Sequence, residues 1–245
     1  MDWKVIDYES IDSTNLEARR LVEAGEGGPG LVVRARHQEA GRGRLQRSWW
    51  DLPGKSLLVS LVLDVTPGLE ATRLACVATA AAIRREGKTG PRIKWPNDLV
   101  YGRKKVAGVL AEALPSGELT VVGAGINVNY LPGELIHPEA TSLLIEEREL
   151  WDPDRLLAAL LEEVGLRLAG EAADWGREYT AGLAYLGEAV TVRPPFTVHG
   201  EARGRVEGLE GILQGVDASG FLLLSAEDTV YRVMAGDLCP GEGSA

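Results

Sequence analysis

The sequence has little cysteine and little histidine. Its two cysteines, Cys76 and Cys239, lie far apart along the 245 residues. Two distant cysteines do not make a disulfide framework, so a reducing compartment, the cytoplasm, is expected. Only three histidines occur, and none has metal-ligand spacing with a cysteine. We therefore expect no fixed metal site built by the protein itself.

Long apolar runs and an excess of basic residues are also missing. No run approaches the ~18 apolar residues of a membrane span. The first residues have neither the basic nor the apolar region of a signal peptide, so we expect no membrane association. Lys and Arg number 26 against 36 Asp and Glu, a net charge of −10, which argues against general nucleic-acid binding. The 45% apolar content allows a sizeable core.

One short segment inverts this acidic balance. Residues 34–47 hold five arginines and one carboxylate, a local charge of +4 (5 − 1), with Gly41 and Gly43 between them and Trp49 just beyond. Glycine lets a backbone approach a ligand closely, and arginine offers a rigid fork of donors to phosphate or carboxylate. The segment predicts a site for an anionic small molecule. A solvated loop or an RNA-contacting segment is the alternative at this point.

Hydrophobic periodicity predicts an α+β fold with a mixed sheet and flanking helices over residues 1–185. Thr14 and Glu17 have the spacing of a capping box, and Asp152 before Pro153 is typical of a helix N-cap. The predicted strands are 5–11, 31–33, 57–63, 92–94, 99–101, 106–114 and 119–129, and the predicted helices are 12–24, 69–85 and 153–168.

The pattern changes near residue 186. Short apolar segments at 190–192, 202–206, 210–216, 221–225 and 231–233 are separated by glycines. Regularly spaced short strands of this kind are typical of a small all-β barrel. We therefore predict two domains, 1–185 and 186–240.

Two polar motifs flank a predicted hairpin. The turn Lys94-Trp95-Pro96-Asn97-Asp98 ends one strand, and Lys105 follows Asp98 by seven residues across the hairpin, so the two side chains could face each other. Asp98 could hold a lysine or a hydrated Mg²⁺. Gly108 would let a ligand pass close to the strand. An ordinary turn beside an exposed lysine is the alternative interpretation.

The remaining motifs exclude familiar nucleotide sites. Gly123-x-Gly125 is not followed by a helix, so it fails as a dinucleotide-binding motif, and no Walker-type loop is present. Polar residues Ser13, Thr14 and Asn15 open a helix, where they could cap it or hold a polar ligand.

Taken in order, these motifs resemble biotin protein ligase from about residue 5 to residue 238. The resemblance rests on Ser13-Thr14-Asn15, Gln38-x-x-Gly41-Arg42-Gly43-Arg44-x-x-Arg47-x-Trp49, Lys94-Trp95-Pro96-Asn97-Asp98, Lys105-x-x-Gly108 and Gly123-x-Gly125-Ile126-Asn127. Gly215-Val216-Asp217 and the residues after it resemble the C-terminal barrel of that family. Many members carry Arg-Gly where this chain has Leu45-Gln46.

The resemblance implies a ligase that activates biotin with ATP and Mg²⁺ and transfers it to a lysine of a biotin carboxyl carrier domain. It implies catalytic roles for Lys105, Asp98 and Arg42. By the same resemblance, biotin contacts Ser13, Thr14, Asn15, Gln38, Gly41, Arg42, Gly43, Arg44, Lys105 and Gly108, and ATP contacts Arg44, Arg47, Trp49, Asn97, Lys105, Gly123 and Asn127.

Further expectations come with this resemblance. Some members carry an N-terminal DNA-binding domain, for which there is no room before Ile11, so no DNA-binding role is expected. A homodimer through a sheet edge is a further family-based expectation. The rival functions are a lipoate or octanoate ligase or transferase of the same fold, and a non-enzymatic RNA-binding or adaptor protein.

Overall fold

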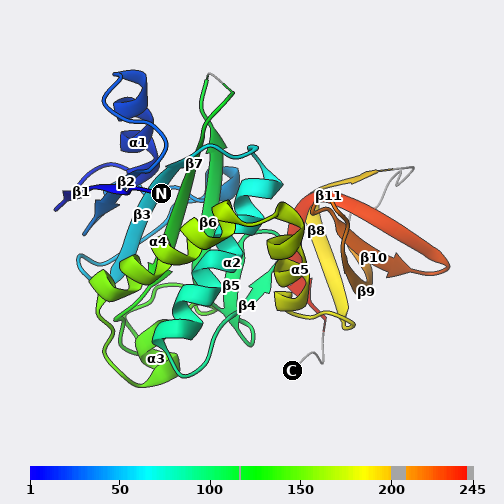
Figure 1. Cartoon of the computed structure of the whole chain (residues 1–245). Coiled ribbons are helices and arrows are strands. Elements are labelled where there is room, and N and C mark those ends of the chain that lie inside the picture. The colour runs from blue at the N-terminus through cyan, green and yellow to red at the C-terminus, as the bar shows by residue number, and fades with distance from the viewer. Residues whose placement is uncertain (116, 200–207, 242–245) are drawn as a thin grey trace.

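A seven-stranded mixed sheet forms the larger part of the protein (Figure 1). The computed structural model describes residues 1–115, 117–199 and 208–241. The strand order is β1-β2-β3-β7-β6-β5-β4, in which β1 and β2 are parallel and the other neighbours antiparallel. The strands are β1 (Lys4–Tyr8), β2 (Leu31–Ala35), β3 (Ser56–Leu63), β4 (Arg92–Lys94), β5 (Asp98–Tyr101), β6 (Lys104–Ala113) and β7 (Thr120–Asn127).

The two faces of the sheet have different partners because side chains alternate along a strand. Leu57, Val59 and Leu61 of β3 join the main core beneath the helices α2 (Leu69–Glu86) and α4 (Pro153–Ala169), which lie side by side in Figure 1. Val62 belongs to a second cluster beneath α1 (Thr14–Glu23). The face with α1 also carries Ser60, and so it is the face where polar side chains can meet a ligand.

A closed barrel of four antiparallel strands follows the helix α5 (Ala172–Gly182), which Figure 1 shows between the sheet and the barrel. Its strands are β8 (Ala189–His199), β9 (Leu209–Val216), β10 (Leu222–Ala226) and β11 (Thr229–Pro240). Leu213 and Leu224 are fully buried inside it. The strand predicted at 202–206 lies outside the described residues. Among the described residues, no helix is long and apolar enough to span a membrane.

The capping box predicted at Thr14 and Glu17 is wrong. Ser13 occupies the N-cap position of α1 without a side-chain cap, and Glu17 accepts a hydrogen bond from the Tyr8 hydroxyl at 2.8 Å. Thr14 is therefore the first residue of the helix and not its N-cap, and its hydroxyl donates to Gln38. At α4 the predicted cap is confirmed, since Asp152 accepts from the backbone N–H of Asp154 at 2.8 Å. Helices α3 (Leu143–Glu147) and α5 were not predicted, because neither has a long apolar period.

Glu147 at the end of α3 ties the loop after α2 to the sheet. Its carboxylate accepts backbone N–H bonds from Lys88 and Thr89, both at 3.1 Å, and a hydroxyl bond from Tyr101 at 3.3 Å. Burial alone would raise the pKa of this carboxyl, but the hydrogen bonds outweigh burial and hold the pKa below the ordinary 4.5.

We expect Glu147→Gln to lower the free energy of unfolding by about 2 kcal/mol near neutral pH, since it turns one acceptor into a donor facing N–H groups. The folded-state pKa is depressed, so this contribution is present above pH 4.5 and is lost as the pH falls through the folded pKa. Urea denaturation at neutral pH and at decreasing acid pH measures it. Glu149→Gln is the control and should change little, because Glu149 is exposed and its ion pair with Lys88 lies at the surface. An equal loss for both variants at neutral pH would contradict the expectation.

Candidate active site

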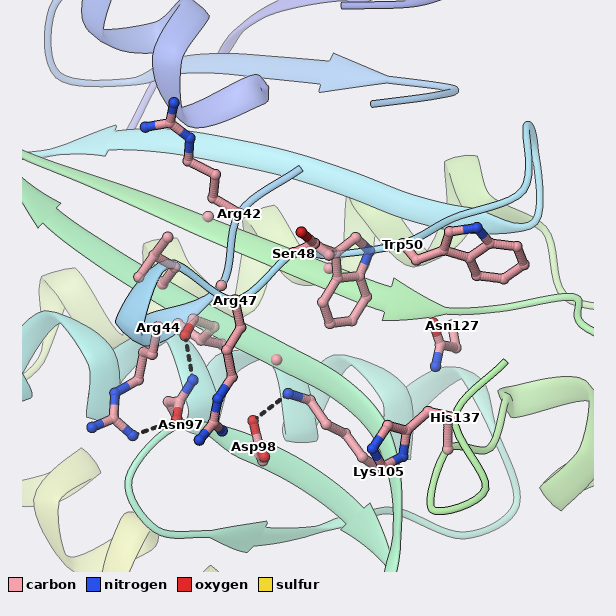
Figure 2. A pocket seen from close by; sticks show the side chains of 18 of the residues that line it. Arg42, Arg44, Arg47, Ser48, Trp50, Asn97, Asp98, Lys105, Asn127 and His137 are labelled. Atoms are coloured by element: carbon pink, nitrogen blue, oxygen red, sulfur yellow. Dashed lines mark hydrogen bonds and ion pairs between the residues drawn. The ribbon is translucent and has the colours of Figure 1, made fainter. Parts of the chain in front are cut away.

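A cavity of about 450 Å³ opens on the face of the sheet that carries α1. Its wall comes from α1, the Arg/Gly loop (residues 38–50), the β4–β5 turn, β6, β7, the segment 135–140 and β11. Figure 2 shows side chains of the loop, the turn, β6 and β7 around it. Six cationic side chains and three carboxylates line it, a local charge of +3 (6 − 3) in a chain of net charge −10. The cations are Arg42, Arg44, Arg47, Lys94, Arg103 and Lys105, and the carboxylates are Asp98, Glu139 and Asp237. The cavity is therefore suited to anionic ligands.

Glycines make the floor of the cavity. Gly108 of β6 pairs with Gly125 of β7, and Leu110 pairs with Gly123, so three positions that face the cavity lack a Cβ. The indole of Trp49 lies on this patch. A Cβ added to Gly125 would lie 2.7 Å from two indole carbons, and one added to Gly108 would lie 3.3 Å from a third. The buried indole N–H has no hydrogen-bond partner among the described residues.

The Arg/Gly loop folds as a narrow hairpin above this floor. The backbone N–H of Trp49 donates to the carbonyl of Gly41 at 2.8 Å, and that of Gly43 donates to the carbonyl of Arg47 at 2.7 Å. At the tip, Leu45 and Gln46 have φ values of 54° and 58°. Side chains are strained in this left-handed region whereas glycine is not, so the Leu-Gln pair makes the tip less favourable than an Arg-Gly pair would.

Two arginines of the loop reach across to other elements. Arg44 Nη1 donates to Asn97 Oδ1 at 3.2 Å in the β4–β5 turn. Arg47 makes an ion pair with Asp237 of β11, and Arg44 lies 4.0 Å from the same carboxylate. Figure 2 shows Arg44 and Arg47 pointing toward Asn97 while Arg42 points away from them. The barrel thus contributes an acidic side chain to the wall of the cavity.

Lys105 and Asp98 face each other, as the sequence predicts. Lys105 Nζ lies 2.6 Å from Asp98 Oδ1, with 36% and 19% of the two side chains exposed (Figure 2). Asp98 pairs with Gly108 in the β5–β6 ladder, which brings the carboxylate beside Lys105. The backbone of Lys105 is held on its other side, where its N–H donates to the Glu139 carbonyl at 2.7 Å. Lys94 Nζ lies 4.0 Å from Asp98, so two ammonium groups flank one carboxylate.

Amide and hydroxyl groups gather at the opposite end of the cavity. Gln38 Oε1 accepts from the Thr14 backbone N–H at 2.7 Å and from its hydroxyl at 3.0 Å. Buried Ser60 lies 2.7 Å from the Thr14 hydroxyl and donates to Asn15 Oδ1 at 2.6 Å. Asn15 Nδ2 donates to Glu112 at 2.6 Å. Since its oxygen is committed to Thr14, Gln38 can offer its amide N–H groups to a ligand.

The cavity brings together the residues that the resemblance implies, with one exception. All of them line it except Gly41, whose backbone lies against Trp49, where a Cβ would lie 2.7 Å from the Trp49 carbonyl oxygen. Gly123, predicted to contact ATP, lies beside the amide cluster, where its Cβ position is 2.3 Å from Asn15 Oδ1. Asn127 lines the cavity and donates to the Thr141 carbonyl at 3.0 Å.

Sequence reasoning missed several residues of the wall. No sequence pattern around Asp237 marks it as a site residue, because it belongs to the barrel strand β11 and lies 190 residues from Arg47 in the chain. His137 and its neighbours in the segment 135–140 have no motif of their own and reach the cavity through backbone pairing with Lys105. Ser48, Trp50, Lys94 and Arg103 also line the wall. Ser48 and Trp50 flank Trp49, and Lys94 and Arg103 lie within three residues of Asn97 and Lys105.

The cavity lies on a mixed sheet and has a glycine floor, a cationic wall and a lysine–carboxylate pair. These features define a protein that binds anionic ligands and carries out a reaction on them. The profile of the biotin/lipoate A/B protein ligase family matches residues 8–129. The biotin–[acetyl-CoA-carboxylase] ligase of Paracoccus denitrificans is 35% identical, over 87% of this chain and 90% of that protein. The chain belongs to this family, and it is a ligase.

Two further relatives agree with this assignment. The biotin–[acetyl-CoA-carboxylase] ligase of Mycobacterium tuberculosis is 29% identical, over 96% of this chain and 89% of that protein. The biotin protein ligase of Aquifex aeolicus, in complex with biotin and ATP, superposes with a TM-score of 0.80 at 26% identity, over 96% of this chain and 97% of that one. The α+β fold with a C-terminal β-barrel is confirmed, and the RNA-binding and adaptor interpretations fall away.

Proposed function

We propose that this protein joins biotin to a lysine of a carrier domain of acetyl-CoA carboxylase in two steps. In the first, the biotin carboxylate attacks the α-phosphate of ATP, giving biotinyl-5′-AMP and pyrophosphate. In the second, the carrier lysine attacks the mixed anhydride, giving an amide and AMP. The observation that carries the proposal is the Lys105–Asp98 pair inside a cavity of charge +3.

Lys105 would offset the repulsion between the two anionic reactants. A carboxylate and a phosphate approach each other only if positive charge stands between them as the bond forms. The Lys105 ammonium can do this, because the Asp98 carboxylate fixes its position at 2.6 Å while the side chain remains 36% exposed to the cavity. The protein then contributes position and charge, with no covalent step of its own.

The two ends of the cavity suit the two substrates. The amide cluster of Ser13, Thr14, Asn15 and Gln38 offers donors and acceptors for the ureido ring of biotin. The arginines of the loop and Asn97 suit phosphate, and Trp49 with Asn127 suits the nucleoside. Arg42 would meet the substrates once the loop closes over them, which would also shield the anhydride from water.

Magnesium would enter with the phosphates of ATP. Mg²⁺ takes oxygen ligands and is often bound by one carboxylate together with substrate phosphates. Asp98 could supply one such ligand through Oδ2, because Oδ1 is paired with Lys105 whereas Oδ2 lies 4.0 Å from Lys94, beyond hydrogen-bond distance. The ion would neutralise phosphate charge, which adds to what Lys105 and the loop arginines do.

The proposal also covers the partner, the compartment and the oligomeric state of the protein. The partner is the carrier domain of a biotin-dependent carboxylase, and the protein works in the cytoplasm. A homodimer through a sheet edge is proposed by family resemblance. No DNA-binding role is proposed, which agrees with the net charge of −10.

We expect incubation with ATP, Mg²⁺, biotin and a carrier domain to add one biotinyl group to the carrier, as read by mass spectrometry. Omitting ATP is the control and should leave the carrier unchanged. Lipoate and octanoate offered in parallel should add no mass. No gain with biotin would contradict the proposal, and a gain only with lipoate or octanoate would assign the rival reaction of the same family.

A further inference from the structure

The β4–β5 turn is fastened from outside the sheet by two buried hydrogen bonds. The Trp95 indole N–H donates to the carbonyl of Gly220, in the β9–β10 turn of the barrel, at 3.0 Å. The Tyr179 hydroxyl, on α5, donates to the carbonyl of Pro96 at 2.9 Å. Trp95 is 1% exposed and Tyr179 is fully buried. A buried hydroxyl without a partner is unfavourable, so this bond fixes the tyrosine and the turn together.

The same turn sets the geometry of the site. Asn97 donates to the Val109 carbonyl at 2.7 Å and accepts from Arg44 at 3.2 Å. The next residue, Asp98, holds Lys105 at 2.6 Å. A shift of the Pro96 carbonyl would therefore move Asn97 and Asp98, and with them Arg44 and Lys105. Positions this close to the chemistry tolerate little displacement, because a small misplacement of reacting groups slows the reaction strongly.

Tyr179 remains a hydrogen-bond donor throughout the working pH range. Burial in the main core raises the pKa of its hydroxyl well above the ordinary 10. Tyr179 does not line the cavity, so it acts on the site only through the backbone that it holds.

We propose that Tyr179 is a positioning residue for adenylate formation, acting through the Pro96 carbonyl on the Asp98–Lys105 pair. The inference rests on the proposed function and deepens it. It connects the rate of the first step to α5, a helix from which no described side chain lines the cavity.

Tyr185 provides a matched control within the same structure. Its hydroxyl donates to the carbonyl of Gly102 at 2.9 Å, in the β5–β6 turn at the other end of the same hairpin strand. Tyr179 and Tyr185 each lie 83 residues from the carbonyl they hold, and both are buried. The two differ in which turn they fasten, so a general loss of packing affects both and a loss of positioning affects Tyr179 alone.

The test compares Tyr179→Phe, Tyr185→Phe and the wild type in single-turnover formation of biotinyl-adenylate. Rates are divided by the concentration of biotin-binding sites found by titration, so that unfolded protein does not count. We expect Tyr179→Phe to lower the rate constant about tenfold, with KM values for biotin and ATP within about twofold of wild type. We expect Tyr185→Phe to leave the rate constant unchanged.

The inference is overturned if Tyr179→Phe slows the reaction no more than Tyr185→Phe does. It is also overturned if Tyr179→Phe raises a KM value but leaves the rate constant unchanged. Trp95→Phe removes the second fastening of the turn and should also lower the rate constant per binding site. A wild-type protein that makes no biotinyl-adenylate would instead refute the proposed function. The two failures are therefore distinguishable.

Discussion

Replacing Lys105 by alanine should reduce biotinyl-adenylate formation about a thousandfold, because the reaction loses the charge that stands between its two anions. The remaining cations of the cavity lie on other elements, and Lys94, which also flanks Asp98, lies 4.0 Å from Oδ2 rather than beside Oδ1, where Lys105 stands. The side chain is 36% exposed and packs in no core cluster, so the fold should be unaffected. Pyrophosphate release measures the rate, and circular dichroism the fold.

Lys104→Ala is the matched control for this variant. Lys104 precedes Lys105 on β6 and is exposed, and it does not line the cavity. Its removal takes one positive charge from the same strand and should change the rate by less than about twofold. If Lys104→Ala and Lys105→Ala slow the reaction equally, general surface charge rather than the lysine–carboxylate pair drives it, and the proposed role of Lys105 is wrong.

Alanine at Gly125 and at Gly123 should separate the two substrates. At Gly125 the new methyl group would lie 2.7 Å from the Trp49 indole and would displace it. Because the nucleoside then loses a stacking surface, the KM for ATP should rise about tenfold. At Gly123 it would lie 2.3 Å from Asn15 Oδ1, which Ser60 holds in place, so the KM for biotin should rise instead. Steady-state kinetics with each substrate varied in turn measures both.

Gly165→Ala on α4 controls for the substitution itself. A methyl group there meets nothing within 4 Å, and alanine in a helix should stabilise the protein by about 1 kcal/mol. Its KM values should equal those of the wild type. The resemblance to biotin protein ligase placed Gly123 with ATP, whereas its position beside Asn15 favours biotin. A rise in the KM for ATP in Gly123→Ala would favour the first assignment.

The sequence predicted the elements that depend on local pattern. The strand β3 is a continuous apolar run and the helices α2 and α4 have long apolar periods, and their burial follows from these patterns. The Lys105–Asp98 contact was also predictable, because a hairpin with a short turn brings the start of β6 beside β5. Lys105 pairs with Val100 in that ladder, and its side chain reaches Asp98 from there. The capping box failed because the N-cap of α1 is Ser13, one residue before Thr14, and the Glu17 side chain accepts from Tyr8.

The order of the motifs along the chain by itself determined the family, since the Arg/Gly loop, the Trp-Pro-Asn-Asp turn and Lys105 are all local features. Only the tertiary structure decided which distant residues surround these motifs. Asp237 meets Arg47 and Tyr179 meets Pro96 because the barrel and α5 pack against the sheet. Such contacts join residues far apart in sequence through burial and charge, and no local period records which distant groups the folded chain brings together.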